Sequence, residues 1–288
     1  MKKLLTLCVL DPLKALPILL FYGFARLLPV DASSKIFGTL ARKLGPFLKV
    51  NQLGRDNLTR AFPEKSQADI NKILEGVWEN LGRIVGEFPH AMRIARDPKR
   101  VTMANASIFK GSVKSGRPIL FMAGHLGNWE IPHGIVITHQ HPIALISRPP
   151  NNFWIKKLFD CVRHHPLVTI FFKGSEGSRQ IMQHLKAKGS LGVLFDQRLS
   201  DGDPLMLFDQ QALTATGPAK LAKKYNALMV PVQVERLNNK VAFRITFHEP
   251  VDTSQSPEDI MQSFNQHLED WVRMHPEQWL WLHKRWKL

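Results

Sequence analysis

From residue 117 onward, short apolar runs alternate with segments of helical pattern, and this alternation limits the possible fold more than any other feature. The apolar runs lie at 118–123, 143–147, 167–172, 191–195, 227–234 and 242–247, and the helical segments at 129–139, 151–163, 175–187 and 217–225. Continuous apolar runs of this length are typical of strands buried on both faces of a sheet. The pattern predicts an α/β fold with a central mostly parallel or mixed sheet flanked by helices. The last two strands are candidates for an antiparallel pair.

The first hundred residues have helical patterns instead. A helix start at Asp31 leads into an amphipathic stretch that runs to Leu48. From Ser66 to Phe88 apolar residues recur three and four positions apart, which is the stripe of a helix that packs on a core. A final helix is expected over 256–274. No linker or internal repeat divides the chain, so we expect one catalytic domain, 31–288, preceded by an N-terminal segment, 1–30.

The N-terminal segment 1–30 is strongly apolar but carries charges. Its first apolar run resembles part of a signal peptide, yet Asp11 ends the run and no small-residue cleavage site follows, so cleavage is not expected. Residues 12–30 are nearly long enough to cross a bilayer, but they include Lys14 and Arg26. The segment is predicted to be a membrane anchor, either a single span or a helix that lies in the interface.

The net charge of the chain is strongly positive. Lysine and arginine outnumber aspartate and glutamate by 39 to 24, which gives a formal net charge of +15. Such a charge attracts anionic partners, and anionic lipid, a phosphorylated substrate, an acidic carrier protein and nucleic acid all fit. Because the lysines are scattered and the aromatic residues lie mainly in apolar patterns, we expect no nucleic-acid partner.

Metal and disulfide sites are not indicated by the sequence. Cys8 and Cys161 form neither a disulfide framework nor a zinc spacing, which agrees with a reducing cytoplasm. Histidine pairs occur at 139 and 141 and at 164 and 165, but neither has a third ligand at a recognised spacing. We therefore expect no metal ion and no cofactor.

The first predicted strand runs directly into a turn that carries a histidine. Residues 120–132 read LFMAGHLGNWEIP, so His125 precedes Glu130 by five positions. In one continuous helix these two side chains would lie about 140° apart, on different faces. A turn is therefore required, and the two glycines of the segment favour one. With Asn128 as the N-cap of the following helix, Glu130 is predicted to lie beneath His125 and to hold one imidazole nitrogen.

A histidine and a carboxylate in this arrangement suit general base catalysis. The free nitrogen of His125 would take a proton from an acceptor hydroxyl, while Glu130 stabilises the positive charge that develops. Backbone amides around Gly127 and Asn128 are expected to stabilise the developing oxyanion, and Asn128 is therefore included among the substrate-binding residues. No serine or cysteine lies in a nucleophile-elbow context, so no acyl-enzyme is expected.

Further candidates follow other predicted strands, because sites in open α/β sheets gather at the carboxyl ends of strands. Arg148 follows the second strand and is predicted to hold an anionic group of a substrate. Asp196, Gln197 and Arg198 follow the strand 191–195 and are assigned more loosely to the head group of the acceptor. A structural cap is the alternative reading of these three residues.

Three tryptophans in the C-terminal tail lie among cations. They are Trp279, Trp281 and Trp286, with Lys284, Arg285 and Lys287 between and beside them. Because the other end of the chain is apolar, we predict that these tryptophans rest at a bilayer surface rather than stack on bases.

Four segments together resemble the bacterial lipid A biosynthesis acyltransferases. They are GHLGNWE at 124–130, SRPP at 147–150, DQ at 196–197 ahead of TATGPA at 214–219, and PEQWLWLHKRW at 276–286. The resemblance implies an enzyme on the cytoplasmic face of the inner membrane, in contact with anionic lipid. It further implies that the enzyme takes a fatty acyl chain from acyl carrier protein and adds it to a hydroxyl of a lipid A precursor.

The motifs leave the acceptor open, because a histidine base serves any hydroxyl. The alternative reading is an acyltransferase that acts on a lysophospholipid, a glycolipid or an ornithine-type lipid. The length of the acyl chain, the hydroxyl that receives it and the oligomeric state are not indicated by the sequence.

Overall fold

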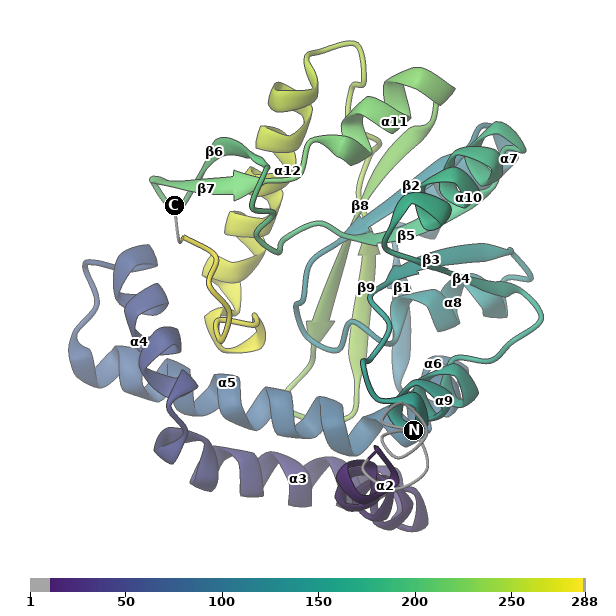
Figure 1. Cartoon of the computed structure of the whole chain (residues 1–288). Coiled ribbons are helices and arrows are strands. Elements are labelled where there is room, and N and C mark those ends of the chain that lie inside the picture. The colour runs from purple at the N-terminus through teal and green to yellow at the C-terminus, as the bar shows by residue number, and fades with distance from the viewer. Residues whose placement is uncertain (1–10, 287–288) are drawn as a thin grey trace, which may run out of the picture.

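A seven-stranded sheet forms the centre of the protein. The computed structural model describes residues 11–286. The strand order is β1-β9-β8-β2-β5-β3-β4, and each neighbouring pair is parallel except β8 with β9. The strands are β1 (Val101–Ala104), β2 (Ile119–Ala123), β3 (Ile143–Ser147), β4 (Val168–Phe172), β5 (Ser190–Leu194), β8 (Leu228–Arg236) and β9 (Phe243–Phe247). The predicted α/β sheet is confirmed, including its antiparallel last pair (Figure 1).

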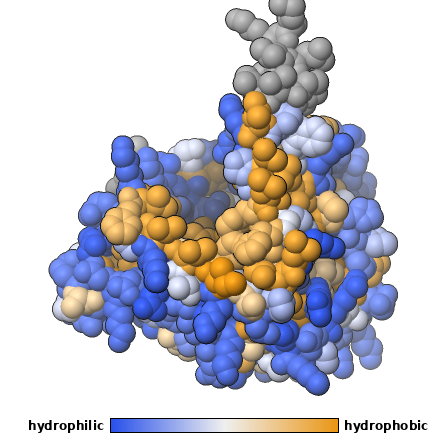
Figure 2. Space-filling model, turned by 90° about the horizontal axis from the view of Figure 1, so that it is seen from below, coloured by the Kyte–Doolittle hydropathy of each residue, from blue (hydrophilic) through white to orange (hydrophobic). Residues whose placement is uncertain are grey.

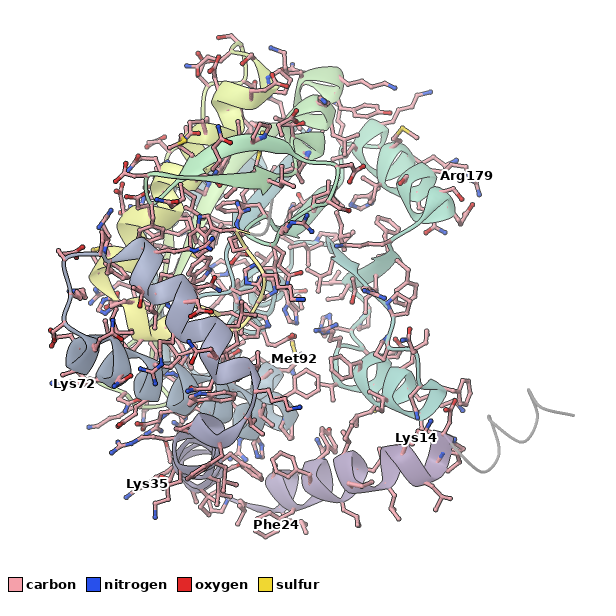
Figure 3. All side chains as sticks on the ribbon, turned by 60° about the vertical axis from the view of Figure 1, so that its left-hand side comes forward. Lys14, Phe24, Lys35, Lys72, Met92 and Arg179 are labelled. Carbon is pink, nitrogen blue, oxygen red and sulfur yellow. The ribbon has the colours of Figure 1, made fainter. Side chains whose placement is uncertain are left out.

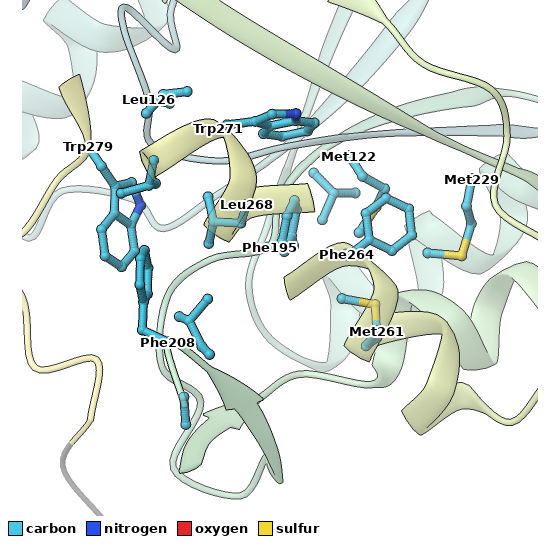
Figure 4. Packing of buried hydrophobic residues seen from close by; sticks show 14 of the residues in the cluster. Met122, Leu126, Phe195, Phe208, Met229, Met261, Phe264, Leu268, Trp271 and Trp279 are labelled. Atoms are coloured by element: carbon cyan, nitrogen blue, oxygen red, sulfur yellow. The ribbon is translucent and has the colours of Figure 1, made fainter. Parts of the chain in front are cut away.

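The two faces of the sheet pack in separate hydrophobic cores, and the central strand β2 contributes to both. Ile119, Phe121 and Ala123 point into one core, while Leu120 and Met122 point into the other, as expected for alternating side chains. The first core is covered by α6 (Ala91–Ala95), α7 (Ala106–Lys114) and α8 (Pro132–Thr138). The second core is covered by α10 (Ser175–Lys186), α11 (Gly217–Tyr225) and α12 (Pro257–Met274). Figure 4 shows the α12 side chains packed against the sheet.

Helices of the N-terminal part of the chain run along one side of the sheet (Figure 1). They are α2 (Asp11–Leu27), α3 (Val30–Leu44), α4 (Val50–Ala61) and α5 (Gln67–Glu87). α5 begins after Ser66, whose side chain accepts a hydrogen bond from the backbone N–H of Asp69. α3 and α5 approach so closely at Gly82 that a Cβ atom there would lie 2.3 Å from the carbonyl oxygen of Phe37. The predicted helices of this region are confirmed.

The structure adds elements that the sequence pattern did not predict. β1 lies at one edge of the sheet, and β6 (Asp203–Leu207) and β7 (Gln210–Thr214) form a separate antiparallel pair between β5 and α11. β6 and β7 contain charged, amide and proline residues that rarely indicate strands. The helix predicted from residue 129 begins only at Pro132, and this delay changes the site described below.

The N-terminal segment is helical from Asp11, and α2 leaves many large apolar side chains exposed. They are Leu13, Leu16, Ile18, Leu20, Phe21, Phe24 and Leu27. Across the described range, 11–286, none of the helices combines the length and the apolar character needed to cross a bilayer. Residues 1–10, which include the first apolar run and Cys8, lie outside the described residues, as does Lys287.

Candidate active site

The turn after β2 carries His125 and is tightly packed. Gly127 has a φ of +58°, and a Cβ atom there would lie 2.8 Å from the carbonyl oxygen of Val234. Glycine adopts this backbone conformation without steric cost, so the predicted role of glycine in the turn is confirmed at this position. The carbonyl oxygen of His125 accepts a hydrogen bond from the backbone N–H of Leu280, so the C-terminal tail fixes the turn from outside.

Asp196, not Glu130, holds the imidazole of His125. Its Oδ1 atom lies 2.7 Å from His125 Nδ1, and its Oδ2 atom accepts the backbone N–H of His125 at 2.7 Å. β2 and β5 are adjacent and parallel, with Ala123 opposite Leu194. His125 and Asp196 each lie two residues beyond that pair, so the register of the sheet brings them together. The expected assignment of Asp196 to the acceptor head group is wrong, because its side chain is fully buried.

Glu130 forms an ion pair with Arg163, which follows α9 (Phe153–Val162). Its two carboxylate oxygens accept bonds from Arg163 Nη2 at 2.5 Å and Nε at 3.1 Å. The predicted hydrogen bond between Glu130 and His125 is therefore wrong. Glu130 does not reach His125 because α8 begins only at Pro132 and Glu130 stays in the turn. Its backbone N–H is bonded there to Asn128 Oδ1 at 3.1 Å.

The charges around His125 alter two pKa values. Burial favours the neutral imidazole, but the neighbouring Asp196 carboxylate outweighs burial and raises the pKa of His125, with a further contribution from Glu130. Burial alone would raise the pKa of Asp196, yet His125 and the hydrogen bonds to the carboxylate hold that pKa well below its usual range. Asp196 therefore stays ionised and accepts a hydrogen bond from the Nδ1–H group of His125, which leaves Nε2 as the basic nitrogen.

The C-terminal tail completes the support of this pair. The indole N–H of Trp279 donates to Asp196 Oδ2 at 2.7 Å. Trp279, Trp281 and Trp286 are all buried, so their predicted place at a bilayer surface is wrong. Sequence reasoning missed the role of Trp279, although the alternation of tryptophan and leucine at 279–282 is a signal for an extended segment with one buried face.

The other predicted residues lie in different surroundings. Gln197 is exposed, and its Nε2 atom lies 3.4 Å from His125 Nε2, so these two residues do come together. Arg198, the residue after Gln197, is half-buried. Arg148, the residue after the end of β3, is exposed. Asn128 is fully buried and its side-chain amide donates to Glu87, so this side chain does not face a substrate, while the predicted role of its backbone amide stays a prediction.

The predicted oxyanion donors also need correction. The backbone N–H of Gly127 donates to the carbonyl oxygen of Gln278 at 3.1 Å, so this amide is already bonded. The turn 124–131 lies entirely before α8, which begins at Pro132. The backbone amides of Gly127 and Asn128 are therefore not part of a helix N-terminus.

His125 can act as a base toward a molecule that reaches its Nε2 atom. Its side chain is 12% exposed, whereas that of Asp196 is 1% exposed. A buried carboxylate behind a partly exposed imidazole can fix the tautomer and stabilise the imidazolium that forms when a proton is taken up. Within residues 11–286, no group of three or more histidine, cysteine, aspartate or glutamate side chains is arranged to hold a metal ion.

Comparison with known proteins places the chain in a family. Residues 16–288 match the family model of the bacterial lipid A biosynthesis acyltransferases. A protein of Haemophilus influenzae described as a lipid A biosynthesis acyltransferase is 22% identical over 270 residues, covering 88% of this chain and 81% of the relative. The family match extends over nearly the whole sequence and includes every residue of the candidate site. The chain therefore belongs to the bacterial lipid A biosynthesis acyltransferase family.

Proposed function

We propose that this protein transfers a fatty acyl chain from acyl carrier protein to a hydroxyl of a lipid A precursor. Membership of the acyltransferase family supports the reaction class. The observation that carries the mechanism is the contact between His125 and Asp196, in which a buried carboxylate orients a partly exposed imidazole.

In the proposed reaction the Nε2 atom of His125 takes the proton of the acceptor hydroxyl as its oxygen attacks the thioester carbonyl. The tetrahedral intermediate then collapses, the carbon–sulfur bond breaks, and the carrier thiolate receives the proton from the imidazolium. Asp196 stabilises the imidazolium during this cycle, and the ester forms without a covalent enzyme intermediate. Gln197, which faces Nε2 across 3.4 Å, contacts the acceptor hydroxyl in this scheme.

The proposal includes binding to the cytoplasmic face of the inner membrane through α2 and α3. The large exposed apolar residues of α2 continue on α3 and the short helix after it, at Ile36, Leu40, Leu44 and Phe47. Figure 2 shows these residues' side of the molecule as an apolar band beside a hollow with hydrophilic walls. Lys14, Phe24 and Lys35 lie along the same edge (Figure 3), and cations flanking an apolar face favour anionic lipid.

The test is transfer of a labelled acyl chain from acyl carrier protein thioester to a lipid A precursor that bears Kdo sugars. We expect His125→Ala to lower kcat by about 10²- to 10⁴-fold, the usual contribution of a general base. His139→Gln, which changes an exposed histidine beyond α8, is the matched control and should keep full activity. Full activity of His125→Ala would exclude the mechanism, and transfer only to another lipid would exclude the acceptor.

A further inference from the structure

A buried ion pair lies behind the His125 turn, outside the residues that the proposed reaction uses. Glu87, the last residue of α5, is fully buried, and Arg236, the last residue of β8, is 3% exposed. Arg236 Nη1 and Nη2 donate to the two Glu87 carboxylate oxygens at 2.5 and 2.9 Å. Two parallel hydrogen bonds of this kind fix the relative orientation of both side chains.

Both partners of the ion pair are also tied to the turn that carries His125. Glu87 Oε2 accepts a hydrogen bond from Asn128 Nδ2 at 2.8 Å. On the other side, Arg236 Nε donates to Asn80 Oδ1 at 2.8 Å, and Asn80 Nδ2 donates to the carbonyl oxygen of Gly127 at 3.0 Å. Two consecutive residues of the turn are therefore held by one buried charge pair.

The same carboxylate is bonded to α3. Ser34 Oγ donates to Glu87 Oε1 at 2.7 Å, and Arg83 Nη1 in turn donates to Ser34 Oγ at 3.2 Å. Glu87 thus accepts four hydrogen bonds: two from Arg236, one from Asn128 in the His125 turn and one from Ser34 in α3. α3 is also the helix whose outer side carries exposed Ile36 and Leu40.

We propose that Glu87, paired with Arg236, is a positioning residue for acyl transfer that holds the His125 turn through Asn128 and Gly127. This inference rests on the proposed function of His125. Buried ion pairs contribute little net stability compared with apolar residues of the same volume, so stability alone gives no reason for this pair. A fixed turn keeps the Nδ1 atom of His125 against Asp196, and release of the turn weakens that contact.

Asn128→Ala tests the inference because it removes the bond to the turn and leaves the ion pair intact. We expect kcat to fall at least about tenfold with KM changed less than about twofold, which corresponds to loss of one hydrogen bond to a charged group. The matched control is Asn265→Ala, which removes another fully buried asparagine, bonded to Met206 and Thr214. The control should lower the melting temperature similarly and keep kcat.

A second readout is the pKa of His125, measured by NMR of ring-labelled protein without substrate. The charged and titratable groups that act on this imidazole are Asp196, Glu130, Lys173 and His283. Asn128→Ala removes none of these four groups, so a fall in the pKa of His125 reports a longer distance to Asp196 or to Glu130, whose backbone N–H is also bonded to the Asn128 side chain. The control should keep the wild-type value.

Glu87→Gln tests the central residue itself and is expected to lower kcat at least as much as Asn128→Ala. Where this variant does not fold, the neutral double exchange Glu87→Gln with Arg236→Gln is measured, since it leaves no unpaired buried charge. Wild-type kcat and wild-type His125 pKa in Asn128→Ala would overturn the inference. If the wild-type protein transfers nothing to the lipid A precursor, the proposed function fails, while the NMR comparison still decides the role of the turn.

Discussion

The Nδ1 atom of His125 lies 2.7 Å from the Oδ1 atom of Asp196, although 71 residues separate them in the chain. The contact exists because β2 and β5 are parallel neighbours in a fixed register. Any change that preserves the register but removes the carboxylate charge isolates the contribution of Asp196 to the chemistry.

Asp196→Asn is expected to lower kcat by about 10²- to 10⁴-fold with a much smaller effect on KM. The amide is similar in size, but it no longer stabilises an imidazolium and it can favour the wrong imidazole tautomer. Steady-state kinetics with the acyl carrier protein thioester measures the effect. Gln197→Ala is the comparison, because it changes the next residue without removing the buried charge. Equal losses in the two variants would contradict a special role of Asp196.

The raised pKa of His125 predicts a pH dependence of both activity and stability. Activity requires the free base, so kcat/KM should rise with pH through an apparent pKa above the ordinary value of 6.5. The protonated imidazole stabilises the folded state below the unfolded pKa, and this contribution is lost as pH rises through the raised folded value. Urea unfolding of wild type and His125→Gln at several pH values measures it. A difference that grows with rising pH would contradict the sign.

Trp279→Phe is expected to lower kcat about tenfold, since the ring volume is largely kept while the indole donor to Asp196 is lost. The matched control is Trp281→Phe, which removes an indole N–H that donates to the carbonyl oxygen of Pro276 instead. Both variants should lose similar thermal stability. Only Trp279→Phe should lower the pKa of His125 as well as kcat, and a parallel change in Trp281→Phe would rule out the specific support of Asp196.

The elements of the sheet were largely predictable from the sequence, but the contacts of the site were not. Apolar runs define β2 and β5 locally, whereas their adjacency depends on a strand order that no local pattern contains. Asp196 was therefore recognised as a residue at a strand end without its partner. Glu130 was paired with His125 because they are close in sequence, and that inference depended on a helix start that the structure moves to Pro132.

The tail and the buried charges were missed for a related reason. Trp279 donates to Asp196 beyond β5, and Gln278 bonds to Gly127 of the β2 turn and to Arg236 of β8, all far away in the chain. A segment in which tryptophans lie among cations has the same sequence pattern whether the tryptophans face lipid or fill a core. Glu87 and Arg236 likewise read as ordinary surface charges of a helix and a strand, because only the packed structure reveals that they are buried together.

The pair of Glu130 with Arg163 predicts an energetic coupling that a double-mutant cycle can measure. Glu130→Gln alone leaves Arg163 partly buried without a full negative partner and should destabilise the fold by about 1–3 kcal/mol. Adding Arg163→Gln should restore part of that loss, because two amides carry no unpaired charge. Additive losses in urea unfolding would show that the two residues do not interact in solution.

The exposed apolar residues of α2, α3 and the short helix after α3 predict how the protein binds vesicles. Replacing Leu40 and Phe47 together by glutamate should weaken co-sedimentation with vesicles that contain anionic lipid, since each change removes apolar area and adds repulsion. Met274→Glu is the matched control, because Met274 is 58% exposed at the end of α12. High salt should weaken the binding of the wild-type protein without abolishing it, because salt screens the cations but not the apolar contact. Complete release of the wild-type protein by salt, or equal binding of the double variant, would contradict the assignment of this edge to the membrane.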